Sequence, residues 1–378
     1  MLGWVGIAIL SGILLGQVFP EGVSRFFVTF NSLFGNFLSF VIPLIILGLV
    51  APAIGELGKG AGRLLLLTAL IAYGSTVFSG FFTYFSSNAV FSNILETSTE
   101  LTKMEGGATN LTPYFVIEIP PLFDIMSALV LSFIIGLGIS VISGDTLQKV
   151  FIDFRDIITK VISSVIVPLL PLHIFGIFLN ISSSGQVVVV MSMFFKVIIV
   201  VFVLHILILL IYFTISGIIG KRNPLKMLKT MLPAYATALG TQSSAATIPV
   251  TLRQALKLGV REPIAVFVVP LCATIHMPGS MMKIVSCAMA IMIMTGEPVS
   301  LSLFAGFIMM LAITMVAAPG VPGGAIMAAL GLLASMLGFT ETQQALMIAI
   351  YIAMDSFGTA CNVTVDGAVS VVIDKIAK

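Results

Sequence analysis

Charged residues are scarce in this chain of 378 residues. Lys, Arg, Asp and Glu make up 9% of it, against roughly 25% in a typical soluble domain. Hydrophobic residues make up 58%, and the mean hydropathy is +1.17. A soluble fold of this composition would expose large apolar patches and aggregate, which excludes a water-soluble globular domain. The net charge of +2 gives no indication of a nucleic-acid partner.

Cysteine and histidine are also rare, with 3 residues each. Cys272, Cys287 and Cys361 lie within apolar segments and lack metal-ligand spacing, which favours small buried hydrophobic side chains. No pair of nucleophile and base, and no His-rich metal spacing, falls on one predicted helix face. We therefore expect neither an enzyme nor an organic cofactor.

What the chain has instead is long apolar runs. Several reach the roughly 18 residues that mark a membrane span, and they predict an all-α polytopic membrane protein. Residues 2–19 have no basic start and no small-residue cleavage site, so they predict a first membrane helix and not a removed signal. Further helices are predicted at residues 28–55, 62–88, 120–143, 157–181 and 187–219, with a polar loop at 90–118.

Two later apolar blocks are interrupted by small or polar residues. Residues 240–244 interrupt the block 228–258, and residues 317–324 interrupt the block 300–338. The arms of each block are too short to span a bilayer alone, which is typical of a re-entrant helical hairpin. Irregular backbone at membrane depth is tolerated only where it is buried in protein or lines a cavity, so two such tips indicate a transporter's binding site.

Basic residues indicate the orientation of the chain. With a cytoplasmic N-terminus and two re-entrant hairpins, only Arg25 and Lys103 fall on the outer side. Fourteen basic residues fall on the cytoplasmic side: Lys59, Arg63, Lys149, Arg155, Lys160, Lys221, Arg222, Lys226, Lys229, Arg253, Lys257, Arg261, Lys375 and Lys378. If one hairpin were counted as a single span, every later loop would move to the opposite side of the membrane. The bias of basic residues therefore supports the re-entrant arrangement.

Two carboxylates, Asp355 and Asp366, lie within an apolar helix predicted at residues 342–375. With Thr359 and Asn362 they have i, i+4, i+7, i+11 spacing, which places all four on one helix face. An ionised carboxylate at bilayer depth costs several kcal/mol unless a cation meets it. The pattern predicts that one carboxylate binds a metal ion and the other a substrate amine. The alternative is a structural pair satisfied by helix–helix hydrogen bonds.

A histidine and a lysine lie in the helix predicted at residues 262–296, which Pro278 and Gly279 should unwind. Freed backbone carbonyls are good ligands for a hard monovalent cation. His276 is either a hydrogen-bonded structural histidine or a proton-coupling group. Lys283 either extends to the membrane interface, pairs with a carboxylate, or acts as a built-in cation that replaces an ion.

Four motifs in this order resemble the dicarboxylate/amino acid:cation symporter family, which includes the glutamate transporters. They are the serine-rich segment 242–249, the unwound segment 276–280, the tip 320–323 and the helix signature 355–366. The resemblance covers essentially the whole chain and is strongest from residue 228 onward. It is closest to the family's serine/threonine:sodium symporter branch.

The resemblance implies a homotrimer of eight-span subunits, each with two hairpins, in the inner (cytoplasmic) membrane. Residues 1–60 and 120–182 would form a trimerisation scaffold. Residues 61–89 and 187–378 would form a transport domain that carries a substrate across the bilayer as a rigid body, an elevator-like mechanism.

The resemblance also assigns the substrate site. Asp355 would bind the substrate amino group. The α-carboxylate would be held by Thr359, Asn362 and the backbone of Ser243 and Ser244. The remaining positions of the site are Gln242, Ser280, Val321 and Gly358.

Position 358 departs from the family's acidic-substrate members, which carry an arginine there to pair with a side-chain carboxylate. Gly358 supplies no cation, and Ser280 replaces a threonine that contacts the same carboxylate. A second buried carboxylate on the substrate would lack a partner. We therefore predict a small neutral amino acid such as serine, threonine or alanine.

The coupling ion implied by the resemblance is Na⁺. A first sodium site would combine one carboxylate with backbone carbonyls, at Asp366, Cys272, His276 and Asn362. A second would consist of backbone carbonyls alone, near Thr274, Met277, Val316 and Ala318.

A third sodium site of the family is degenerate here. Tyr73 and Thr76 remain, but Val77, His276 and Pro278 replace its other ligands, so we predict that it does not bind sodium. Fewer ions per cycle should follow, with a nearby basic side chain taking the place of one.

Two alternatives stay open. Proton-coupled or exchange transport of amino acids or dicarboxylates, with reduced sodium dependence, would use His276 and Lys283 beside the degenerate site. A channel-like anion conductance, which the family shows as a side activity, is disfavoured because two hairpin tips are typical of an occluding site.

Overall fold

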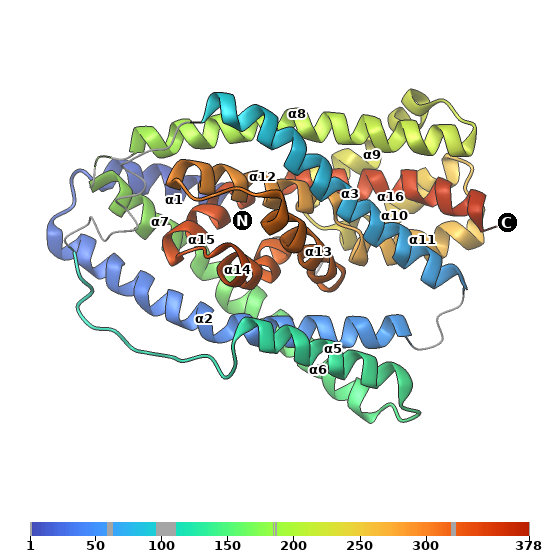
Figure 1. Ribbon diagram of the computed structural model, residues 1–378. Coiled ribbons are helices and arrows are strands. Elements are labelled where there is room, and N and C mark those ends of the chain that lie inside the picture. The colour runs from blue at the N-terminus through green and yellow to red at the C-terminus, as the bar shows by residue number, and fades with distance from the viewer. Residues whose placement is uncertain are drawn as a thin grey trace.

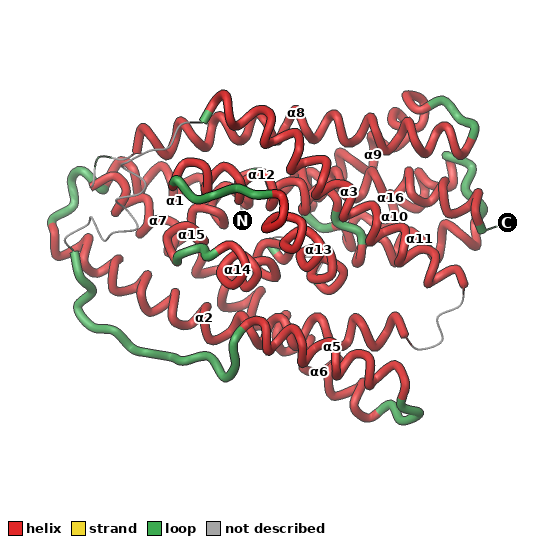
Figure 2. The backbone as a smooth tube through the Cα atoms, viewed as in Figure 1, coloured by secondary structure: helices red, strands yellow, loops and turns green. Residues whose placement is uncertain are grey.

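The computed structural model describes residues 2–58, 63–95, 111–183, 185, 187–318 and 323–377, and every regular element in these ranges is a helix (Figures 1 and 2). The first part of the chain forms α1 (Leu2–Leu15), α2 (Glu21–Gly58), α3 (Arg63–Ile94), α5 (Ile125–Val141), α6 (Thr146–Val161), a π-helical turn (Ile162–Ile166), α7 (Val167–Ser183) and α8 (Val187–Gly220). The second part forms α9 (Pro224–Thr241), α10 (Ser244–Lys257), α11 (Glu262–Ile275), α12 (Pro278–Thr295), α13 (Leu301–Ala317), α14 (Gly324–Leu337), α15 (Glu341–Ala353) and α16 (Asp355–Ile376).

Each helix expected from an apolar run is present, but several are longer than predicted. Helix α2 begins at Glu21 instead of residue 28, and Pro43 and Pro52 lie inside it without ending it. The helix expected from residue 157 begins at Thr146, because α6 is amphipathic and its charged residues Lys149 and Asp153 face outward. The prediction counted only apolar residues and therefore missed this polar extension.

Six of the described helical segments are long and apolar enough to cross a membrane. They are Glu21–Gly55, Arg63–Ile94, Thr146–Ser183, Val190–Gly220, Glu262–Thr295 and Asp355–Ile376. The apolar helices α1 and α5 have 14 and 17 residues. At 1.5 Å per residue they fall short of the roughly 30 Å hydrocarbon core, so the count of eight spans remains a prediction. The predicted orientation also remains a prediction, and its basic residues Lys59, Lys103 and Lys378 lie outside the described residues.

Both predicted hairpins have two separate helical arms that pack together, α9 with α10 and α13 with α14. In the first, Gln242 adopts a left-handed conformation (φ 54°) and the Ser243 side chain accepts a hydrogen bond from the backbone N–H of Ala246, which begins α10. In the second, Gly323 precedes α14 with φ 74°. The rest of that tip, including Val321, lies outside the described residues, and the re-entrant placement of both hairpins stays a prediction.

Two helices are broken in the C-terminal part. The break between α11 and α12 falls at His276 and Met277, as Pro278 and Gly279 predict. The helix predicted at 342–375 is also broken, at Met354, so the prediction of one continuous helix was wrong. Asp355 therefore lies in the first turn of α16, where the positive end of the helix dipole favours a carboxylate.

The helices pack in two groups. Helix α2 packs against α5, α6 and α7, and α1 packs against α7. Helix α16 packs against α8, α9, α10, α11 and α12, and α3 packs against α12 and α13. In Figure 1, α2, α5 and α6 lie along one side of the molecule and α8, α9 and α16 along the other, with α13 and α14 between them and in contact with α2. The division into a scaffold and a transport domain stays a prediction.

Helices α12 and α16 approach closely at a glycine. A Cβ on Gly279 would lie 2.6 Å from the Gly358 carbonyl oxygen and 2.6 Å from the Cβ of Cys361. Because backbone cannot move aside as a flexible side chain does, the contact requires glycine at this position.

Gly279→Ala should lower the melting temperature of the detergent-solubilised protein, because overpacking a core typically costs about 1–3 kcal/mol. The matched control is Gly74→Ala in α3, where a Cβ meets nothing within 4 Å. There the added methyl should leave the melting temperature unchanged or raise it slightly, since alanine is the better helix former. Equal melting temperatures for the two variants would contradict the close approach.

Candidate functional site

Residues of both hairpins contact the first turn of α16. The side-chain amide of Gln242, in the turn of the first hairpin, donates to Ser356 Oγ at 2.9 Å. The backbone N–H of Gly323, beside the second tip, donates to Asp355 Oδ2 at 2.8 Å. The structure thus joins both hairpins to one end of α16, next to the broken α11–α12 helix.

The predicted polar face of α16 is present and buried. Asp355, Thr359, Asn362 and Asp366 are 6%, 8%, 3% and 1% exposed. The Asn362 side-chain oxygen accepts a 2.7 Å hydrogen bond from the Gly279 backbone N–H, and its amide donates to Ser280 Oγ at 3.2 Å. In this conformation Asn362 therefore holds the start of α12 against α16.

Asp355 forms a buried ion pair with Lys283. The Lys283 Nζ lies 3.1 Å from Asp355 Oδ1, 3.4 Å from the Met354 carbonyl oxygen and 3.7 Å from the centre of the Tyr351 ring. The two charged side chains are 1% and 8% exposed. Of the three roles considered for Lys283, extension to the membrane interface is excluded by this burial, and pairing with a carboxylate is observed.

The same lysine corrects the interpretation of Gly358. The missing side chain at position 358 predicts that this part of the site has no cation. In the structure, a Cβ on Gly358 would collide with Cε and Nζ of Lys283. The cation is therefore present, but it comes from α12 instead of α16, and Asp355 already neutralises it.

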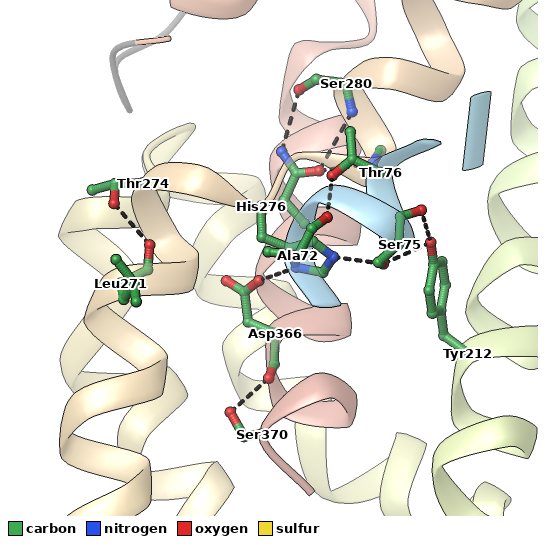
Figure 3. A network of polar contacts seen from close by, with 12 residues as sticks. Ala72, Ser75, Thr76, Tyr212, Leu271, Thr274, His276, Ser280, Asp366 and Ser370 are labelled. Carbon is green, nitrogen blue, oxygen red and sulfur yellow. Dashed lines mark hydrogen bonds and ion pairs between the residues drawn. The ribbon is translucent and has the colours of Figure 1, made fainter. Parts of the chain in front are cut away.

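Asp366 is paired with a second base, as Figure 3 shows. His276 Nδ1 lies 2.7 Å from Asp366 Oδ1, and His276 Nε2 lies 2.8 Å from Ser75 Oγ. Ser75 Oγ in turn donates to the Tyr212 hydroxyl at 2.8 Å. His276 is thus hydrogen-bonded on both sides and connects α16 with α3 and α8.

The first predicted sodium site fits a small hard cation in one respect. Asp366 Oδ2 is buried and accepts no hydrogen bond from any residue that the structure describes. Ligand atoms of Cys272, His276 and Asp366 lie within 4.8 Å of one another. Sulfur and imidazole nitrogen are poor ligands for a hard cation, so Asp366 Oδ2 and nearby backbone carbonyls are the better donors.

The second predicted sodium site lies at helix ends. Thr274 is exposed and its hydroxyl donates to the Leu271 carbonyl, while Met277 is buried at the start of α12. Val316 and Ala318 lie at the C-terminal end of α13, which contacts both α11 and α12. The negative ends of α11 and α13 favour a cation there, but the ligand set itself stays a prediction.

The residues of the degenerate third site are engaged elsewhere. The Tyr73 hydroxyl donates to the Met309 carbonyl at 3.4 Å, and Thr76 donates to the Ala72 carbonyl within its own helix. The Pro278 carbonyl accepts a 2.7 Å hydrogen bond from Ser79. That no sodium binds at this site stays a prediction.

Sequence reasoning missed three contributors. Ser75 and Tyr212 complete the hydrogen bonds around His276, and Tyr351 lies beneath the Lys283 ammonium. Tyr351 carries a usable signal, because it precedes Asp355 by four residues. For Tyr212, an aromatic residue in an apolar helix, the sequence offers none.

Comparison with known proteins finds a family match over nearly the whole chain. The Sodium:dicarboxylate symporter family model matches residues 1–376. The chain is 27% identical to the serine/threonine transporter SstT of Acinetobacter baumannii (strain AYE), over 97% of this chain and 94% of that protein. It is 28% identical to an excitatory amino acid transporter of Caenorhabditis elegans and 26% identical to excitatory amino acid transporter 2 of Homo sapiens, over 63% and 62% of this chain.

The matched region spans about half the length of these animal relatives, 48% and 42%. The family and the relatives are transporters and not enzymes, as the sequence predicted. The family match covers nearly every residue and confirms the resemblance found in the motifs. The chain therefore belongs to the sodium:dicarboxylate symporter family.

Proposed function

We propose that this protein is a secondary active transporter that couples uptake of a small neutral amino acid, of the serine, threonine or alanine type, to sodium. The observation that carries the proposal is the pair of buried carboxylates on α16, one at the junction of both hairpins and one with an oxygen that lacks a hydrogen-bond partner among the described residues. Asp355 binds the substrate amine, and Asp366 Oδ2 contributes to the sodium site.

The charges of the buried cluster favour a neutral substrate. The cluster of Lys283, Asp355, Asp366 and His276 has a net charge of −1 when the imidazole is neutral. A zwitterionic amino acid adds no net charge, so one sodium ion at Asp366 neutralises the loaded site. An acidic amino acid would leave an uncompensated negative charge at membrane depth, which is costly. A neutral substrate thus stays favoured although Lys283 places a cation beside Gly358.

The carboxylate of the substrate would bind near the first hairpin turn. Ser243 and Ser244 lie at the start of α10, where backbone N–H groups and the helix dipole favour an anion. The hydrogen bond from Gln242 to Ser356 holds this turn beside Asp355. Thr359 and Asn362 lie on the same face of α16 as Asp355.

The helix groups support an elevator-like mechanism in a multi-pass inner-membrane protein. The group of α2, α5, α6 and α7 would form the scaffold with the trimer contacts. The group around α16 would form the moving domain. Helices α13 and α14 lie between the groups and contact Asp355 through Gly323, so opening of the second hairpin would expose the site.

Proton coupling is the second candidate, and the His276–Asp366 contact favours it. In its protonated form, His276 neutralises Asp366 without sodium and gives the cluster a net charge of zero. Sodium and a proton on His276 are thus two ways to supply one positive charge at one carboxylate.

The two couplings should separate in proteoliposomes with imposed gradients. We expect serine or threonine to accumulate when an inward sodium gradient is imposed at equal pH on both sides. Accumulation driven by a proton gradient in sodium-free buffer would replace the first candidate with the second. Rates that rise without saturation to channel values would contradict both.

Asp355→Asn should weaken serine or threonine binding about tenfold or more, because a hydrogen bond to a charged group contributes roughly 1.5–3 kcal/mol. Isothermal titration or a ligand-induced thermal shift would measure the change. Asp153→Asn is the matched control, since Asp153 is an exposed carboxylate on α6, away from the site. Unchanged affinity in the Asp355 variant would contradict the assignment of the amine ligand.

A further inference from the structure

The Lys283 ammonium has the surroundings that a substrate amino group would need. A lysine ammonium has three N–H donors, and three acceptors surround this one: a carboxylate oxygen of Asp355, the carbonyl oxygen of Met354 and the ring face of Tyr351. The side chain is 1% exposed. No donor of this buried cation needs a further partner.

Both oxygens of Asp355 are occupied in this conformation. Lys283 lies against Oδ1, and the backbone N–H of Gly323 donates to Oδ2. The backbone at the start of α14 therefore contacts a carboxylate that carries an amine of the protein itself. An amino acid could place its own amine on Oδ1 only by moving Lys283 away.

Gly358 makes this arrangement possible. Its missing Cβ leaves the volume that Cε and Nζ of Lys283 occupy between α12 and α16. A small cavity lined by His205, Phe202, Phe357, Gly358 and Lys283 lies next to this position.

We propose that Lys283 is a tethered stand-in for the substrate's amino group. It binds Asp355 when no amino acid is present and leaves that carboxylate when one binds. This role rests on the amino acid transport proposed above, because it concerns the amine ligand of that site.

The exchange of partners defines the substrate class. A displaced Lys283 is a buried cation without an anion, which is costly unless a new carboxylate meets it. The substrate's carboxylate arrives together with the competing amine, and the first hairpin turn that would hold it lies beside Asp355. A zwitterionic amino acid therefore replaces one ion pair with two, whereas an amine alone or a carboxylate alone satisfies only one of the two protein charges.

The same pair affects the return of the empty carrier. With Lys283 on Asp355, this carboxylate stays paired while the empty site crosses the membrane, and Asp355 needs no counter-transported cation. A carrier without Lys283 would cross readily only when substrate covers Asp355.

The test compares net uptake with exchange in proteoliposomes. For Lys283→Met the readout is the ratio of net uptake into empty vesicles to exchange of internal for external amino acid, because loss of a residue of the site can lower both rates. The variant's net uptake into empty vesicles should fall about tenfold or more relative to exchange, because the empty carrier then moves with an unpaired carboxylate. Lys196→Met is the matched control: this exposed lysine of α8 donates to the Ile94 carbonyl, outside the site, and both rates should stay unchanged.

Equal losses of uptake and exchange in Lys283→Met, or no loss of either, would overturn the stand-in role. Should this variant not fold, Gly358→Ala makes the same test with every charge kept, since the new Cβ forces Lys283 off its position. A lower ratio of net uptake to exchange supports the role, and an unchanged ratio overturns it. If the unmodified protein moves no amino acid in either assay, the proposed function fails, independently of Lys283.

Discussion

The cost of a bare carboxylate inside a bilayer constrains the whole C-terminal half of this protein. Asp355 and Asp366 both lie on one face of α16, and each is paired with a base from the α11–α12 segment. Charge pairing of this kind requires short distances, so α12 must lie directly against α16. Gly279 and Gly358 allow that approach, since a Cβ at either position would collide with the opposite helix.

The breaks in the helices place polar groups next to the same two carboxylates. At the α11–α12 break, His276 leaves the helix and its imidazole lies between Asp366 and Ser75. At Met354, the break places Asp355 at the positive end of α16 and frees the Met354 carbonyl for Lys283. Irregular backbone at these two points is satisfied by polar side chains and by the charges themselves, which is the condition for its presence within a membrane.

Local patterns were sufficient to predict much of this arrangement. The run of small residues at 240–244, the Pro278–Gly279 pair and the i, i+4, i+7, i+11 spacing on α16 each act within one element, so sequence alone reveals them. The Lys283–Asp355 pair was only one of three options, because it joins residues 72 positions apart and depends on which way a long side chain turns. The break at Met354 has no proline or glycine to signal it. The polar start of α6 was missed because its charges interrupt the apolar run.

The two charge pairs are also connected to each other. His276 precedes Lys283 by seven residues, whereas its partner Asp366 follows Asp355 by eleven, so α12 and α16 run in opposite directions here. Both bases belong to one short segment that begins at the helix break. A shift of this segment along α16 therefore changes both pairs at once. Displacement of Lys283 by a substrate amine is therefore linked to the charge state of Asp366 through α12. Because the substrate site and the sodium site both act on the position of α12, this helix can couple them.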